Sequence, residues 1–282
     1  MSYFNFNGKL LKEHTAIIDP DNRGLRFGDG LFETIKFKNN QLILADEHFA
    51  RLWQGLKLLQ FNIPKLFTAD LLEEKITELI RKNNQTNARI RLTVIRGNGG
   101  LYDLHNNQPQ YIIQSWELPE TNGGLNQNGL ELCIYKKAFK MADSFSAIKH
   151  NNFLPYFMGA IFAKEEKCND AIILNQHSKI ADSTIANIFY IKNGNIYTPP
   201  LSDGCIAGTM RRFIISELKN EGTVVTEKST TEEELMDADE IFLSNAIYNI
   251  RWVGSIGKKR FKNTSVTEIY RLLEKTNAGV FC

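Results

Sequence analysis

Hydrophobic residues recur every three or four positions in the chain between residues 46 and 60. The recurring residues are Phe49, Leu52, Trp53, Leu56 and Leu59. This spacing predicts an amphipathic helix from Asp46, a suitable N-cap, to about Gln60. A second helix is expected from Thr68 to about Lys82, with Thr68 or Asp70 as its cap.

Shorter apolar runs, which predict strands, flank these two helices. They are Thr15 to Ile18, Leu31 to Phe37, Gln41 to Leu44, Ala88 to Ile95 and Gln110 to Trp116. Asn39 and Asn40 supply turn residues between the second and third runs, so we expect those two runs to form a hairpin.

The second half of the chain has the same mixture of elements. The predicted strands are Leu130 to Lys136, Ala171 to Leu174, Asn187 to Ile191, Asn195 to Thr198, Val224 to Thr226, Ile241 to Leu243 and Ile250 to Val253. The predicted helices are Pro155 to Lys167, Thr209 to Lys219 and Thr264 to Lys275. The acidic run Glu232 to Glu234 indicates a further, solvated helix start, and Asn193-Gly194 predicts a tight hairpin turn.

The stretch from Leu118 to Gly129 has the composition of a linker, because glycine, asparagine and proline dominate it. We therefore expect a small N-terminal domain at residues 1–118, a linker at 119–129 and a larger C-terminal domain at 130–282. Mixed helices and strands in two lobes give an α+β architecture.

The composition is that of a globular protein, with 43% hydrophobic and 23% charged residues. Lys plus Arg is 34 against 32 Asp plus Glu, so no basic excess calls for nucleic acid as a partner. No apolar run approaches the roughly 18 residues of a membrane helix. Met1 to Lys12 lacks a signal-peptide pattern, which predicts a cytoplasmic protein. The four cysteines and five histidines show no metal-ligand spacing, so no metal site is expected.

Three segments contain residues that could carry chemistry. Lys149 lies between an apolar approach and a polar loop, where burial would lower its pKa and favour Schiff-base chemistry, although a surface lysine fits the same pattern. Gly208 and Thr209 precede a helix whose first N–H groups could bind an anion, although a capped turn also explains them. Asp182 leads into an apolar strand, which a plain loop and strand edge would also explain.

Several segments, in this order along the chain, resemble the class IV (fold-type IV) pyridoxal-phosphate enzymes. They are Arg26–Thr34 (RFGDGLFET), His48–Leu52 (HFARL), Arg96-Gly97, Ile148–Asn152 (IKHNN), Ala186–Phe189 (ANIF), Thr198-Pro199, Ala207–Arg211 (AGTMR) and Ala238–Ala246 (ADEIFLSNA). The family includes branched-chain and D-amino-acid aminotransferases and aminodeoxychorismate lyases. The resemblance implies a small N-terminal α/β domain, a larger C-terminal domain with a barrel-like sheet, and pyridoxal 5'-phosphate as cofactor.

The same resemblance implies roles for individual residues. Lys149 would form the Schiff base with the cofactor and move the substrate's α-proton. The cofactor phosphate would be held by Arg51 and by a cup made of Gly208, Thr209, Met210, Asn245 and Ala246. Helical spacing alone places Arg51 opposite the apolar positions and predicts a solvated or interface arginine.

The resemblance also implies which residues would contact the cofactor's pyridine ring. Asp182, where the family usually has Glu, would pair with the ring nitrogen, and Asn187 would also contact the cofactor. Asp keeps the charge but is one methylene shorter than Glu. Phe153 stands where aminotransferases commonly carry Tyr near the cofactor's phenolic oxygen.

Within the family, the Lys149-His150 pair, the helix start at Gly208 and the Ser244–Ala246 loop resemble the lyases. Thr34 occupies the position of a threonine implicated in lyase chemistry. The expected reaction is elimination of pyruvate from 4-amino-4-deoxychorismate to give 4-aminobenzoate, a folate precursor, with Arg96 as a candidate for a substrate carboxylate. The alternatives are a branched-chain or D-amino-acid aminotransferase and a non-catalytic binding protein that keeps the fold. Family members generally form homodimers, so we expect a homodimer acting on a small molecule.

Overall fold

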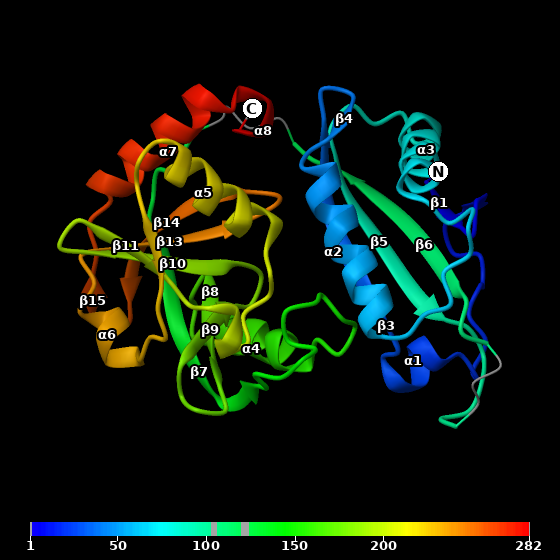
Figure 1. Cartoon of the computed structure of the whole chain (residues 1–282), viewed down its shortest axis with the longest axis horizontal. Helices are drawn as coiled ribbons and strands as arrows, with labels where there is room; N and C mark the ends of the chain where they lie inside the picture. Colours follow the sequence, from blue (N-terminus) through cyan, green and yellow to red (C-terminus); the bar gives the residue numbers. More distant parts are fainter. Residues whose placement is uncertain (1, 103–105, 120–123, 282) are drawn as a thin grey trace. The chain divides into compact units, whose positions relative to one another are not determined.

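The computed structural model describes residues 2–102, 106–119 and 124–281. The chain divides into two compact units, each with its own sheet (Figure 1). The first unit contains Met1–Thr121 and Ile148–Asn152, and the second contains Asn122–Ala147 and Phe153–Cys282. Residues 120–123 of the predicted linker lie outside the described residues.

The sheet of the first unit has six strands in the order β2-β1-β6-β5-β3-β4. The strands are β1 (Tyr3–Phe6), β2 (Lys9–Lys12), β3 (Gly30–Lys38), β4 (Gln41–Leu42), β5 (Ala88–Arg96) and β6 (Pro109–Glu117). The hairpin predicted at Asn39-Asn40 is confirmed, because β3 pairs with β4 and both asparagines have positive φ, at 51° and 59°.

Helices α2 (Ala45–Leu58) and α3 (Ala69–Lys82) pack on this sheet, and α1 (Arg23–Phe27) precedes β3. Both long helices agree with the apolar spacing. The expected cap Thr68 is confirmed, since its side chain accepts a hydrogen bond from Leu71 N at 3.2 Å. The expected cap Asp46 is wrong. Helix α2 begins one residue earlier after Leu44, which has φ 55° and no capping side chain, because the tight β4 turn delivers the chain directly into the helix.

The N-terminal segment differs from the prediction. Thr15 to Ile18 is not a strand, because the chain there has already left the sheet edge and has no strand partner. Instead β1 and β2 form a hairpin whose turn residues, Asn7 and Gly8, have φ values of 49° and 87°. An Asn-Gly pair between alternating residues is the usual signal for such a turn.

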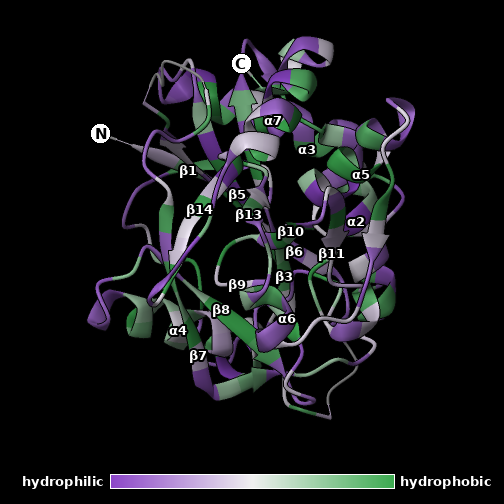
Figure 2. Ribbon diagram, turned by 90° about the vertical axis from the view of Figure 1, so that its left-hand side faces the viewer, coloured by the Kyte–Doolittle hydropathy of each residue, from purple (hydrophilic) through white to green (hydrophobic). Residues whose placement is uncertain are grey.

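The sheet of the second unit has nine strands, in the order β12-β11-β10-β13-β14-β7-β8-β9, with β15 paired to β14. The strands are β7 (Leu130–Lys140), β8 (Asp170–Asn175), β9 (Ile180–Ser183), β10 (Asn187–Lys192), β11 (Asn195–Thr198), β12 (Val225–Glu227), β13 (Glu240–Asn245), β14 (Asn249–Ile256) and β15 (Lys259–Arg260). All six residues of β8 are buried, and the strand is largely in the hydrophobic colour in Figure 2.

The helices of the second unit are α4 (Leu154–Glu165), α5 (Thr209–Asn220), α6 (Glu232–Met236), α7 (Thr264–Thr276) and α8 (Ala278–Phe281), with a 3₁₀ turn at Leu201–Asp203. The three long predicted helices are confirmed, and so is the Asn193-Gly194 turn. The acidic run begins α6, where Thr231 and Glu234 form a capping box. In the part of the chain that the structure describes, no helix has both the length and the apolar character to cross a membrane.

Two predicted boundaries in the second unit need correction. The stretch around Asp182, expected as a loop, contains strand β9, whose four residues are all buried. Strand β7 continues to Lys140, four residues beyond its predicted end at Lys136. Both extensions add polar residues to the interior, which is why hydrophobic patterning did not show them.

Candidate active site

The segment that carries Lys149 lies along strand β3 in the first unit. Phe32 N donates a hydrogen bond to the Lys149 carbonyl oxygen at 2.8 Å, and Asn151 N donates to the Gly30 carbonyl at 2.9 Å. A Cβ atom at Gly30 would lie 2.3 Å from the Val94 carbonyl oxygen of β5, so only glycine lets the backbones of β3 and β5 pack this closely here. The Lys149 ammonium is 4.9 Å from the centre of the Phe32 ring. Lys149 is therefore held by backbone pairing, with its side chain beside an aromatic ring.

A buried carboxylate on the next residue of β3 binds two side chains of α2. Glu33 accepts hydrogen bonds from Arg51 Nε at 2.8 Å and from Arg51 Nη2 at 2.5 Å. His48 Nδ1 lies 2.6 Å from Glu33 Oε2. His48 and Arg51 are three residues apart, so they lie on the same face of α2. This face packs against β3.

Electrostatics hold this cluster in one charge state. Burial raises the pKa of Glu33, but Arg51 and His48 outweigh this effect and lower the pKa to about 2. Burial lowers the pKa of His48, so its ring is neutral near pH 7 and Nδ1 donates to the ionised Glu33. The helical spacing predicted an exposed Arg51, which is wrong, because only 5% of the residue is exposed. Its role toward a phosphate remains a prediction.

The face of the first unit's sheet that carries Phe32 and Thr34 is cationic. Arg91 pairs across the strands with Thr34, and its guanidinium lies 3.8 Å from the Phe32 ring centre. Burial lowers the pKa of Arg91, and neighbouring Arg89 lowers it further. The sequence analysis missed Arg91. The alternation of Arg89, Arg91 and Thr93 with buried apolar residues along β5 was the available signal.

Arg96, the residue expected to bind a substrate carboxylate, contacts groups of its own unit. Its Nε lies 3.6 Å from Asp29, and its guanidinium lies 4.3 Å from the Phe61 ring centre. Its Nη2 donates a hydrogen bond to the Leu59 carbonyl. These contacts fix the orientation of the side chain, and its role toward a substrate stays a prediction.

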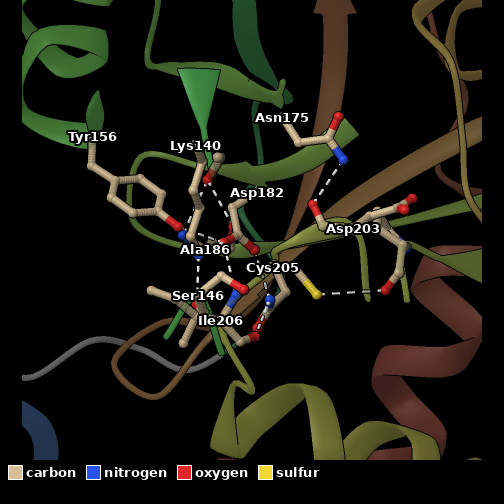
Figure 3. A network of polar contacts seen from close by, with 12 residues as sticks. Lys140, Ser146, Tyr156, Asn175, Asp182, Ala186, Asp203, Cys205 and Ile206 are labelled. Carbon is tan, nitrogen blue, oxygen red and sulfur yellow. Dashed lines mark hydrogen bonds and ion pairs between the residues drawn. The ribbon is translucent and has the colours of Figure 1, made fainter. Parts of the chain in front are cut away.

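In the second unit, Asp182 is the centre of a buried polar network (Figure 3). Only 2% of Asp182 is exposed. Its Oδ2 accepts hydrogen bonds from Tyr156 Oη at 2.7 Å and from Ile206 N at 2.9 Å. Its Oδ1 accepts from Asn187 Nδ2 at 2.8 Å. Lys140 Nζ lies 3.4 Å from Oδ2. The network thus joins Asp182 to Asn187, two residues that the sequence assigned to the cofactor, and adds two that it did not.

The N-terminus of helix α5 lies next to this network. Gly208 is the N-cap and provides no capping side chain. A Cβ at Gly208 would lie 1.9 Å from Asn187 Oδ1, and that amide is fixed because its Nδ2 also donates to the Ile206 carbonyl at 2.8 Å. Thr209 and Met210, in the first turn, are both buried. A helix start with a glycine cap offers N–H groups and the positive end of the helix dipole to an anion.

The end of strand β13 adds a hydroxyl to this region. Ser244 of β13 pairs with Asn187 of β10, and its buried Oγ has no hydrogen-bond partner among the described residues. The side chain of Asn245 instead shapes a turn, since its Oδ1 accepts from Ile247 N at 3.0 Å and from Tyr248 N at 2.8 Å. Asn245 and Ala246 could therefore reach a phosphate through their backbone, and that role stays a prediction.

Comparison with known proteins identifies the family of this chain. The family model described as amino-transferase class IV matches residues 30–256. The chain belongs to the class IV aminotransferase family. This family is pyridoxal-phosphate-dependent, so the chain is an enzyme of the aminotransferase and lyase class that uses this cofactor.

Relatives within the family carry different activities in their names. The chain is 29% identical over 271 residues to a "Putative branched-chain-amino-acid aminotransferase" of Methanocaldococcus jannaschii, covering 95% of this chain and 93% of the relative. It is 28% identical over 255 residues to an aminodeoxychorismate lyase of Vibrio harveyi, covering 90% and 91%. The fold is that of the branched-chain aminotransferase of Thermoproteus uzoniensis, with a TM-score of 0.87 at 24% identity and coverage of 99% and 95%.

The residues present fit pyridoxal phosphate. The phosphate requires donors, which the α5 N-terminus and the unpartnered Ser244 hydroxyl can supply. The ring nitrogen requires an acid, and the buried Asp182 carboxylate is one. The aldehyde requires an amine, and the assignment of Lys149 to this role stays a prediction.

The Glu33 cluster gives a prediction for stability. We expect Glu33→Gln to destabilise the cofactor-free protein by about 3 kcal/mol at pH 7, because the pKa of Glu33 is about 2 against an ordinary 4.5 and Arg51 would lose its counter-ion. A lowered folded-state pKa contributes stability above the ordinary pKa, and that contribution is lost as the pH falls. The difference between the proteins should therefore narrow from about pH 4.5 towards pH 2.

Urea unfolding at pH values from 7 down to about 2 measures this difference. Glu73→Gln is the control, since Glu73 is an exposed carboxylate of the same unit on α3. A Glu33→Gln protein as stable as the Glu73→Gln protein at pH 7 would show that the cluster contributes nothing.

Proposed function

We propose that the chain is a 4-amino-4-deoxychorismate lyase, which eliminates pyruvate from its substrate and leaves 4-aminobenzoate. The observation that carries this proposal is the arrangement around Phe32, where the Lys149 ammonium and the Arg91 guanidinium lie 4.9 and 3.8 Å from one ring. Thr34 lies two residues further along the same strand, directly across from Arg91. A substrate with two carboxylates and a proton to be removed suits this combination of an amine, a fixed cation and a hydroxyl.

Each side chain then has a role in the elimination. Lys149 Nζ, as the neutral amine, takes up the proton from the carbon that carries the amino group and becomes an ammonium. Arg91 binds a substrate carboxylate through charge-assisted hydrogen bonds. The Thr34 hydroxyl donates a hydrogen bond to the departing enolpyruvyl oxygen. Bound pyridoxal phosphate supplies an electron-withdrawing ring that stabilises the negative charge left by proton removal. Loss of the proton and of the enolpyruvyl group makes the remaining ring aromatic, which drives the reaction.

Sequence features and relatives support the lyase. The Lys149-His150 pair and the Ser244–Ala246 loop resemble lyases, and a relative named aminodeoxychorismate lyase matches almost the whole chain. Phe153 stacks on Tyr156 with ring centres 4.3 Å apart and has no hydroxyl for the cofactor's phenolic oxygen. The second candidate is an aminotransferase for branched-chain or D-amino acids. The name of the relative from Methanocaldococcus jannaschii supports the branched-chain activity, and relatives named D-alanine aminotransferase support the other.

Product analysis separates the two candidates. We expect the purified enzyme with its cofactor to release pyruvate and 4-aminobenzoate in equal amounts from 4-amino-4-deoxychorismate. Lys149→Ala should lower this rate roughly 10³-fold or more, because proton transfer by a positioned base is lost. Thr34→Val should lower it about tenfold.

The aminotransferase predicts a different result. An amino acid alone would convert its cofactor to the pyridoxamine form, which absorbs in the near ultraviolet, and no pyruvate would appear from aminodeoxychorismate. Leucine and D-alanine, supplied separately, test the two classes of amino donor. Either conversion in the absence of pyruvate release would overturn the lyase proposal.

The carboxylate site gives a second test. We expect Arg91→Met to raise KM for aminodeoxychorismate by roughly 10- to 100-fold with a smaller change in kcat, because a charge-assisted hydrogen bond to the substrate is removed. Arg96 is the competing candidate for this carboxylate. We expect Arg96→Met to alter KM less, because Asp29, Leu59 and Phe61 already engage that guanidinium. Steady-state kinetics of both variants would show the reverse order if Arg96 binds the carboxylate.

We also propose that the enzyme works as a homodimer in which helix α4 contacts a second copy of the chain. One face of α4 packs on β7 and β8 of its own unit. The other face exposes Leu154, Phe157, Met158 and Ile161, of which Leu154 is 67% and Phe157 61% exposed. These residues are three or four positions apart, so they form one apolar stripe that water disfavours.

A charge within this stripe should separate the subunits. We expect Phe157→Glu to shift the protein from dimer to monomer in sedimentation-velocity runs at micromolar concentration, because each subunit would bring a buried acid to the contact. Leu66→Glu is the matched control, since Leu66 is 85% exposed and lies in the first unit. A Phe157→Glu protein that sediments like the Leu66→Glu protein would place the dimer contact elsewhere.

A further inference from the structure

Lys140 is a buried lysine that the proposed reaction does not use. Only 6% of the residue is exposed. Its Nζ donates a hydrogen bond to the Ser146 carbonyl at 2.9 Å and lies 3.4 Å from Asp182 Oδ2. Figure 3 shows the ammonium between these two acceptors, beside the ring of Tyr156. The distance from Nζ to the centre of that ring is 5.2 Å.

The position of Lys140 depends on an irregularity in strand β7. Residues Leu130 and Leu132 of this strand lie in the core cluster on one side of the sheet, whereas Tyr135 packs with Tyr156 on the side covered by α4. Strict alternation would place Lys140 with Leu132. The register between β7 and β8 shifts between Tyr135 and Lys140. The shift brings Lys140 to the side of Tyr156 and Asp182.

The contacts of Asp182 leave one part of its carboxylate open. Oδ2 is approached by three donors, which are Lys140 Nζ, Tyr156 Oη and Ile206 N. Within residues 2–102, 106–119 and 124–281, Oδ1 accepts a hydrogen bond only from Asn187. Since a carboxylate has about four acceptor positions, Oδ1 keeps one for a further donor. The network therefore orients Asp182 so that Oδ1 is the oxygen available to a cofactor.

We propose that Lys140 is the permanent counter-ion of Asp182, which orients this carboxylate and weakens its attraction for a proton on the cofactor's ring nitrogen. This proposal rests on the proposed role of Asp182. In a site where the carboxylate stands alone, the only nearby cation is the protonated ring itself, and protonation is strongly favoured. Here the ammonium already neutralises the carboxylate, so a second proton next to it would give the buried group a net positive charge.

Other charges around the pair do not replace this effect. Burial lowers the pKa of Lys140, while Asp182 opposes that change and Asp143 opposes it further. Burial raises the pKa of the Cys205 thiol to about 12, so it is neutral at physiological pH. Tyr156 is also neutral, because burial and Asp182 raise the pKa of its hydroxyl. Neither the Cys205 thiol nor the Tyr156 hydroxyl therefore adds a charge beside the pair of Lys140 and Asp182.

The protonation of the ring nitrogen can be measured directly. We expect the enzyme loaded with ¹⁵N-labelled pyridoxal phosphate to show, by its nitrogen chemical shift, a smaller protonated fraction than Lys140→Met at the same pH. The ratio of protonated to unprotonated nitrogen should rise about tenfold in Lys140→Met, since a shift of one pKa unit changes this ratio tenfold. Lys140→Gln, which keeps a polar group for Ser146, should give the same rise.

Two controls separate the charge of Lys140 from its packing. Lys140→Arg keeps the cation and should restore the ratio of the unchanged enzyme. Lys136→Met removes an exposed lysine of the same strand, whose partner is Glu232, and should have no effect. Ratios in Lys140→Met and Lys140→Gln that match that of Lys136→Met would overturn the proposal.

Asp182→Asn distinguishes this failure from a failure of the proposed site. If Asp182→Asn lowers the protonated fraction while the Lys140 variants change nothing, Asp182 binds the ring nitrogen and Lys140 does not tune it. If Asp182→Asn also leaves the fraction unchanged, the proposed role of Asp182 is wrong, and the inference about Lys140 falls with it.

Discussion

Each unit of this protein contains a carboxylate that is almost completely buried, and the local structure depends on the partners that surround it. Glu33 is 1% exposed and Asp182 is 2% exposed. An isolated charge in such a position would cost several kcal/mol. Glu33 avoids this cost through a two-point contact with Arg51 and a hydrogen bond with His48. Asp182 avoids it through Lys140 and three neutral donors. In both cases the partners come from other elements, so the charges also fix how those elements pack.

The two clusters pair the buried carboxylate with different cations, an arginine for Glu33 and a lysine for Asp182. Arg51 presents two parallel N–H groups to Glu33, which gives a rigid pair and a Glu33 pKa of about 2. Lys140 is a point charge that shares its hydrogens between Asp182 and the Ser146 carbonyl, and its distance from Asp182 is longer, at 3.4 Å. The first arrangement is suited to holding a helix against a strand. The second leaves Oδ1 of the carboxylate with one hydrogen bond, from Asn187, while the cation approaches Oδ2.

Sequence patterns were sufficient to predict the helices and strands whose two faces differ in polarity. Helices α2 and α3 have one apolar face, and strands β3, β5 and β10 are each followed by an asparagine or a glycine, so their limits were predicted to within a few residues. Patterns failed where a strand carries polar residues into the interior. Strand β9 contains Asp182 and Ser183, and at the end of β7 only Ala138 and Phe139 lie between lysines, so neither segment has a long apolar run.

For the site, motifs identified residues but not their partners. The resemblance assigned cofactor roles to Lys149, Arg51, Asp182 and Gly208, and the structure gives each of them specific contacts. No spacing rule links Lys140 to Asp182, which is 42 residues away in the chain. Their contact arises from the register shift in β7, and such a shift depends on how two strands pair rather than on either sequence alone. Arg91 differs, because its alternation along β5 was visible from the start. An inward-facing cation in a strand can therefore be found from sequence only when the strand is regular.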